Sequence, residues 1–283
     1  MFVITGITGN VGGQVAGCLL DANRPVRGVV RDLGKGKAWA ERGVEIVQAD
    51  INDALALQPA FQGAEGVFVL VPPNFDPLPD FPEARAIAAA LRSAIDRARP
   101  RKVVYLSTIG AQASQSNLLS QHTIIEHALE ELPVPITFLR PAWFMENCSW
   151  DVAPARENGV IPGFLQPFDK PVPMVAAADI ASVAAGLLQE AWAGKRVVEL
   201  EGPSRITPNQ IAGTFAGLLG RPVRMEIVPH ASWEQLFRSQ GMKNPMPRIR
   251  MLDGFNEGWI EFEGQARKGT VELETVLRRL IST

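Results

Sequence analysis

The sequence has few of the residues that carry most side-chain chemistry. It contains one tyrosine, three histidines and two cysteines among 283 residues. Cys18 and Cys148 lie far apart between apolar neighbours, so we expect reduced thiols and no disulfide framework. The histidines and cysteines show no ligand spacing typical of zinc, so we expect no metal.

Charge of one sign and long apolar runs are also missing. The 28 Lys and Arg residues nearly balance the 30 Asp and Glu residues and are scattered, so nothing indicates a nucleic acid or membrane surface as partner. No apolar stretch reaches the roughly 20 residues of a membrane span. The start lacks the pattern of a signal peptide. We expect a cytoplasmic protein whose partner is a small molecule, with a homodimer left open.

The sequence does have a regular alternation of Val/Ile-rich runs and helix-period segments up to about residue 140, which is typical of βαβ units in a parallel sheet. The predicted strands are 2–5, 26–30, 44–47, 66–71, 102–107 and 136–139, and the predicted helices are 11–22, 53–61, 83–98 and 119–131. Prolines then interrupt the pattern. Beyond them we predict helices at 179–192 and 208–219, strands at 196–200 and 223–228, and a helix-rich tail from Ser232. Asp179 is the expected cap of helix 179–192, and Asn52 or Asp53 that of helix 53–61.

This element order predicts an α/β protein with a Rossmann-type doubly wound parallel sheet and a smaller C-terminal substrate lobe. We expect residues 1–145 to form the NAD(P)-binding domain, with 176–203 returning to it. Residues 146–175 and 204–283 are expected to form the substrate-binding lobe.

The segment TGITGNVGG, residues 5–13, stands between the first strand and the first helix. Glycines at this spacing allow a tight turn and let backbone amides approach a pyrophosphate, which then rests on the helix N-terminus. The segment therefore predicts a dinucleotide site. Its expected cofactor-binding residues are Thr5, Gly6, Thr8, Gly9, Asn10, Val11 and Gly12.

This loop resembles that of the atypical short-chain dehydrogenases/reductases, in particular the NmrA-like proteins and the type 2 NAD(P)H quinone reductases. Other segments fit the same group in the same order: VRGVVRD (26–32), QADINDALAL (48–57), KVVYLSTIGA (102–111), QHTIIEHALEEL (121–132), LRPAWFMEN (139–147), DIASVAAGLL (179–188) and EGPSRITPNQIAGTFAGLLGRPV (201–223). The resemblance covers nearly the whole chain.

The residues after the second strand indicate which dinucleotide is bound. In such folds an acid here reads the ribose of NAD, whereas a basic group reads the 2′-phosphate of NADP. Arg31 ends the strand and Lys35 follows, but Asp32 is an acid at the right distance from the glycines. The resemblance implies that Arg31 goes with NADP, so we expect NADP(H) in preference to NAD(H). It also implies that Asp50 and Ile51 contact the adenine.

Further cofactor contacts are expected where later strands end, because ligands of doubly wound sheets lie at the carboxyl ends of the strands. Here the resemblance places the nicotinamide. A rigid turn and two aromatic rings follow the sixth strand and suit the stacking of a flat acceptor. The expected residues are Val71, Pro72, Ser107, Thr108, His122, Pro141, Trp143 and Phe144.

The usual acid of short-chain dehydrogenases, a Tyr followed four residues later by a Lys, is absent. Aligned on Glu126, the Tyr position holds Leu118 and the Lys position holds His122. The single tyrosine, Tyr105, lies inside a predicted strand, where we expect it to serve packing. His122 and Glu126 should share a helix face. The catalytic candidates are therefore His122 and Ser107.

These residues are consistent with hydride transfer from NADPH to an electron-poor acceptor such as a quinone or an azo compound, because the cofactor carries the chemistry and the protein orients the two rings. We expect an NAD(P)H-dependent oxidoreductase. The missing Tyr and Lys leave open a regulator that senses NADP(H) without turnover. They also weaken a third reading, an isomerase or epimerase with a tightly held cofactor.

Overall fold

The computed structural model describes residues 1–282. Its centre is an eight-stranded sheet in the order β12-β10-β6-β5-β4-β1-β2-β3, and every neighbouring pair is parallel. The order reverses between β1 and β4, which opens a crevice at the carboxyl ends of the strands. This architecture confirms the predicted fold class. The strands are β1 (Phe2–Thr5), β2 (Val26–Val30), β3 (Glu45–Gln48), β4 (Gly66–Val69), β5 (Val103–Leu106), β6 (Ile136–Pro141), β10 (Lys195–Glu201) and β12 (Arg267–Lys268).

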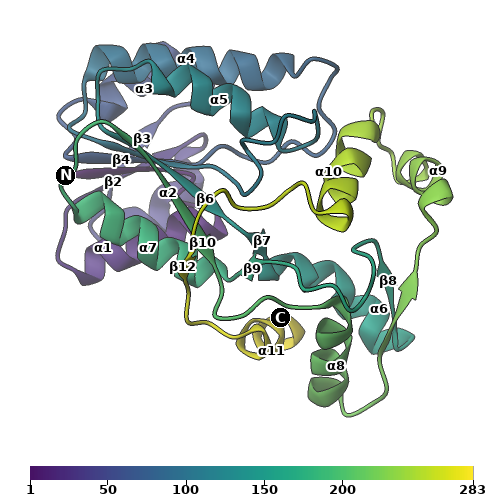
Figure 1. Ribbon diagram of the computed structural model, residues 1–283. Helices are drawn as coiled ribbons and strands as arrows, with labels where there is room; N and C mark the ends of the chain where they lie inside the picture. The colour runs from purple at the N-terminus through teal and green to yellow at the C-terminus, as the bar shows by residue number, and fades with distance from the viewer. Residues whose placement is uncertain (283) are drawn as a thin grey trace.

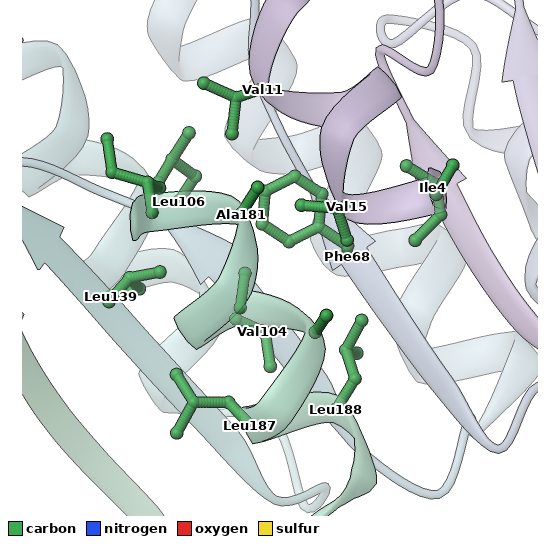
Figure 2. Packing of buried hydrophobic residues seen from close by; sticks show 14 of the residues in the cluster. Ile4, Val11, Val15, Phe68, Val104, Leu106, Leu139, Ala181, Leu187 and Leu188 are labelled. Atoms are coloured by element: carbon green, nitrogen blue, oxygen red, sulfur yellow. The ribbon is translucent and has the colours of Figure 1, made fainter. Parts of the chain in front are cut away.

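Helices cover both faces of the sheet (Figure 1). One face carries α1 (Asn10–Asp21), α2 (Leu33–Ala40) and α7 (Ala177–Gln189), and the other carries α3 (Ala54–Phe61), α4 (Pro82–Ala98) and α5 (Ser120–Glu130). Successive strand residues point to opposite faces, so both faces need apolar side chains. Ile4 and Phe68 pack against Val15 of α1 and Ala181 of α7 (Figure 2), whereas Val3 belongs to the core under α3 to α5.

The C-terminal lobe lies beyond the carboxyl ends of the strands (Figure 1). It has its own apolar core. Two small parallel sheets, β7 with β9 and β8 with β11, brace it. Its elements are β7 (Trp143–Phe144), η1 (Met145–Asp151), α6 (Val152–Glu157), β8 (Val160–Gly163), β9 (Met174–Val175), α8 (Pro208–Leu219), β11 (Arg224–Ile227), η2 (His230–Ser232), α9 (Trp233–Ser239), α10 (Met246–Glu257) and α11 (Leu273–Ser282). None of the helices in residues 1–282 has the length and apolarity to cross a bilayer.

Two helix starts differ in how well the sequence predicted them. Asp53 caps α3 as expected, because its carboxylate accepts hydrogen bonds from the amides of Leu55 and Ala56. The prediction that Asp179 caps the helix around it is wrong. That helix begins at Ala177, and its amide donates to the carboxylate of Glu146 in η1 at 2.9 Å. The Asp179 carboxylate instead accepts from the amide of Val271 at 3.0 Å and so fixes the segment before α11.

Candidate cofactor and acceptor site

The glycine loop between β1 and α1 is shaped for close approach of an anion. Gly6 has a φ of +67°, and a Cβ at Gly12 would lie 2.3 Å from the carbonyl oxygen of Gly6. Thr5 ties the loop to the end of β4, because its hydroxyl donates to the Leu70 carbonyl and accepts from the Leu70 amide. Within the described chain, no side chain caps α1. The amides of its first turn are therefore available to a pyrophosphate.

The acidic and basic residues that follow β2 have different surroundings. Asp32 is the N-cap of α2, and its carboxylate accepts from the Gly34 amide at 2.8 Å. Arg31 and Lys35 are exposed on either side of this cap. Because the Asp32 carboxylate serves the helix, the basic side chains are better placed than the acid to contact a ligand here. This favours a 2′-phosphate over a ribose hydroxyl.

Asp50 and Ile51 follow β3 at the same edge of the sheet. The Asp50 carboxylate accepts from the backbone amide and the side-chain amide of Asn52, both at 2.9 Å. These hydrogen bonds lower the pKa of Asp50. Ile51 is half-buried beside the core under α3. The pair therefore forms an ordered, partly apolar edge next to Arg31.

His122 lies on α5 with its ring against β5. Its Nδ1 and the Tyr105 hydroxyl are 2.7 Å apart. Tyr105 is fully buried, as expected of a packing residue, and its hydroxyl in addition contacts His122. Burial lowers the pKa of His122 to about 4 against an opposing effect of Glu126, so the imidazole is neutral at physiological pH. His122 also lines a small cavity together with Val71 and Pro72 from the loop after β4.

Ser107, Glu126 and Arg140 form a buried network behind the ends of β5 and β6. The Ser107 hydroxyl donates to Glu126 Oε1 at 2.5 Å. Arg140 donates to both carboxylate oxygens of Glu126, at 3.0 and 2.6 Å, and to Glu263 at 2.7 Å. Burial opposes the charge of Arg140, but these partners outweigh it and raise its pKa. Although His122 and Glu126 are both on α5, their side chains thus bind different partners. His122 contacts Tyr105, and Glu126 accepts from Ser107 and Arg140.

A larger cavity of about 470 Å³ opens between the sheet and the lobe. Thr108, Trp143 and Phe144 are among the residues that line it, at the side of the sheet, whereas Ser107 lies in the network behind. Its walls are largely apolar, with Phe75, Leu118, Ile109, Cys148, Phe164, Met174, Met225, Met251, Leu252 and Phe255 among them. Leu118 also lines the small cavity beside His122. Leu118 aligns with the catalytic tyrosine of ordinary short-chain dehydrogenases. It therefore provides an apolar side chain to the wall of both cavities.

Two ionisable side chains in this cavity had no signal in the sequence. Asp151 lies at the end of η1, where burial raises the pKa of its carboxyl to about 7 against a hydrogen bond from Cys148. Arg248 lies in the first turn of α10. Neither belongs to a spacing pattern, because the segments that carry them meet only in the folded lobe.

The fold and the glycine loop define a dinucleotide-binding protein of Rossmann type. The chain belongs to the NmrA-like family, whose model matches residues 1–261, and this confirms the resemblance seen in the motifs.

Among curated relatives, it is 34% identical over 230 residues to (4-alkanoyl-5-oxo-2,5-dihydrofuran-3-yl)methyl phosphate reductase of Streptomyces griseus, covering 80% of this chain and 76% of the relative. It is 29% identical over 260 residues to the NAD(P)H azoreductase of Xenophilus azovorans, with 91% and 85% covered.

Solved structures resemble it over their whole length. The NADPH-dependent quinone oxidoreductase of Escherichia coli, in complex with NADPH, superposes with a TM-score of 0.79 at 25% identity, covering 100% of this chain and 95% of that one. The Citrobacter triphenylmethane reductase gives a TM-score of 0.81 at 22% identity, with 100% and 99% covered, and supports the fold.

Proposed function

We propose that this protein is an NADPH-dependent reductase that passes hydride to a quinone-like or other flat, electron-poor small molecule. The observation that carries the proposal is the aromatic cavity that begins at Thr108, Trp143 and Phe144. These residues lie at or just beyond the ends of β5 and β6, the edge of the sheet at which the glycine loop also lies. A dinucleotide held by that loop would present its reactive ring to the cavity. Relatives named for reducing quinones and azo compounds support the same activity.

The residues present fit NADP(H). The uncapped first turn of α1 would hold the pyrophosphate, and the absence of a Cβ at Gly12 lets this turn pack closely against the backbone of Thr5 and Gly6. Arg31 and Lys35 would hold the 2′-phosphate. We propose that His122, fixed by Tyr105, contacts the cofactor at its nicotinamide end, and that Ser107 acts as a positioning residue through Glu126. When bound, NADPH supplies the hydride.

The chain itself orients the acceptor and keeps water away. Trp143 and Phe144 offer flat apolar surfaces, and Leu118 closes the wall where a tyrosine would otherwise supply a proton. A quinone accepts hydride readily because the resulting negative charge is delocalised, and the accompanying proton can come from solvent. A plain ketone needs a proton at its oxygen during the transfer. We therefore expect poor activity on simple ketones and alcohols.

The test is to titrate the purified protein with NADPH and NADH and then follow NADPH absorbance against quinones, azo dyes and aliphatic ketones. We expect tighter binding of NADPH, and oxidation by the electron-poor acceptors but not by the ketones. Tight NADPH binding without oxidation by any acceptor would overturn the proposal and favour the regulator. Robust NADP-linked oxidation of simple alcohols would contradict the assignment of the acceptor class.

A further inference from the structure

Arg248 is a cation at the wall of the acceptor cavity that has no carboxylate partner among residues 1–282. Its guanidinium stacks over the Phe237 ring at 4.4 Å and lies 5.7 Å from the Trp150 ring centroid. Its one hydrogen bond within residues 1–282 goes from Nη1 to the Met242 sulfur at 3.8 Å, which is a weak acceptor. Burial alone lowers its pKa, because no neighbouring carboxylate compensates. Apart from this weak bond, the guanidinium donors have no acceptor on the described part of the protein.

Arg140, in the buried network behind the ends of β5 and β6, shows how this chain pairs a structural arginine. Arg140 is nearly fully buried, and its guanidinium is satisfied by Glu126 and Glu263. Arg248 also sits in the first turn of α10, where the helix dipole disfavours a cation. Leaving a half-buried charge unpaired at that position costs stability. The two ring contacts offset part of this cost but leave the charge without an anionic partner.

The position of Arg248 in the cavity indicates which part of a bound acceptor would reach its guanidinium. Phe75 and Trp150 also line the cavity, are 46% and 59% exposed, and pack edge to face at 6.1 Å, so they mark its mouth. Arg248 stacks beside Trp150 and thus lies near this mouth, whereas Trp143 and Phe144 line the cavity directly after the end of β6, at the side of the sheet that we call its inner end. A flat ring at the inner end would extend a substituent outward toward the guanidinium.

The other titratable side chains of the cavity wall do not supply a positive charge for such a substituent. They are Cys148 and Asp151, which lie together on η1 and hydrogen-bond to each other. Burial raises the pKa of both groups, so below about pH 7 neither carries a charge. Arg248 is then the charged side chain among the residues that line the cavity.

We propose that Arg248 binds an anionic oxygen group on the acceptor, such as a sulfonate, carboxylate or phosphate, and so selects acceptors that combine a flat electron-poor ring with a negative substituent. This inference rests on the proposed reductase function for its kinetic test. Its binding test does not depend on turnover. A planar guanidinium donates two parallel hydrogen bonds to such groups, which a lysine or an amide does not reproduce.

The kinetic test compares 1,4-naphthoquinone with its 2-sulfonate as acceptors for NADPH oxidation by the wild type, R248Q and R250Q. We expect the wild type to have the lower KM for the sulfonate. R248Q should raise that KM about tenfold or more, as expected for a lost charged hydrogen bond, while changing the KM for the neutral quinone by no more than about threefold. Arg250 is the matched control, because it lies on the same helix but pairs with Asp253. Equal changes for both quinones in R248Q, or equal losses in R250Q, would overturn the inference.

The binding test uses calorimetry of 2-naphthalenesulfonate and 2-naphthol with the NADP⁺-loaded protein. Preferential binding of the sulfonate by the wild type, lost in R248Q, supports the inference even if no quinone is reduced, in which case the proposed function fails alone. Turnover without preference for the sulfonate in either test refutes the inference and leaves the function standing. Should R248Q not fold, the wild-type comparison of sulfonate with neutral ligand decides by itself.

Discussion

At the scale of single residues, we propose that Arg31 determines which dinucleotide is preferred. Its guanidinium is exposed at the end of β2, while the neighbouring Asp32 carboxylate is held by the Gly34 amide. We predict that Arg31→Ala raises the Kd for NADPH by roughly 10- to 100-fold and the Kd for NADH by less than about threefold, because only NADPH carries the 2′-phosphate. Fluorescence titration measures both constants. Arg42→Ala, which removes an exposed cation stacked on Trp39, should change neither, and equal losses of both cofactors in Arg31→Ala would contradict the assignment.

Asp151 is a second residue with a measurable signature, because burial raises the pKa of its carboxyl from 3.8 to about 7. Between these values the folded protein holds a proton that the unfolded chain has released, so the stability falls as the pH rises through this window. Asp151→Asn removes the charge. We predict that its stability relative to the wild type increases by on the order of 2 kcal/mol between about pH 5 and about pH 8, after a discount for partial exposure.

Urea unfolding of Asp151→Asn and wild type at both pH values checks this prediction. Asp169→Asn, at an exposed acid of the same lobe, serves as the control and should show no such pH-dependent gain. A constant difference between Asp151→Asn and wild type across the range would mean that the carboxyl is ionised throughout.

Residue spacing predicted part of the site and missed the rest for a physical reason. It placed His122 and Glu126 on one helix, and both are on α5. The partners of these side chains, Tyr105 and Arg140, come from β5 and β6. Periodicity within one helix contains no information about which groups a neighbouring strand presents. The pairing could therefore be found only once the register of the strands against α5 was known.

At the scale of elements, the turn from β1 into α1 depends on Gly12. A Cβ there would come within 2.3 Å of the Gly6 carbonyl oxygen, a backbone atom that cannot move without deforming the loop. We predict that Gly12→Ala destabilises the protein by about 1–3 kcal/mol and abolishes measurable NADPH binding. Thermal unfolding and cofactor titration measure the two effects.

Gly17 provides the matched control on the same helix. A Cβ at Gly17 would meet no atom within 4 Å, so Gly17→Ala should stabilise α1 by about 0.5–1 kcal/mol and leave NADPH binding unchanged. If both variants behaved alike, the effect of Gly12→Ala would reflect helix propensity and not the close approach of the loop.

Elements were predictable where the sequence carried local signals and were missed where packing forms them. Strands with continuous apolar runs and helices with clear periodicity were located to within a few residues, whereas α2 and α6 were not predicted. Helix α2 has the sequence LGKGKAWA, whose two glycines disfavour a helix. It forms because Asp32 caps its start and Trp39 packs on the core beside Gly13. The Trp39 packing is a tertiary contact, and the Asp32 cap depends on the exact residue at which the helix starts. Periodicity within the segment therefore revealed neither.

At the scale of the whole molecule, a loop after β4 joins the Rossmann domain to the lobe across the mouth of the acceptor cavity. The Asp76 carboxylate accepts from the amides of Lys243 and Asn244 at 2.9 and 2.7 Å, and the Asn244 side chain donates to the Pro77 carbonyl at 3.0 Å. These backbone hydrogen bonds lower the pKa of Asp76, so its contribution to stability is present above the ordinary pKa and is lost as the pH falls below it. The contact joins segments 167 residues apart, which no local pattern predicts.

We predict that Asp76→Ala frees the lobe from this loop without disturbing the cofactor site. The unfolding free energy should fall by about 1–2 kcal/mol, because two amides lose a charged acceptor. The KM for a quinone should rise a few-fold, since Phe75, the neighbour of Asp76, lines the cavity mouth. The Kd for NADPH should stay within about twofold, because the Asp76 carboxylate binds amides of the lobe and not the glycine loop, Val71 or Pro72. Hydrogen exchange gives the most direct measurement. The amides of Lys243 and Asn244 should exchange faster in Asp76→Ala but not in Asp169→Ala, and unchanged protection at both would show that the loop does not hold the lobe.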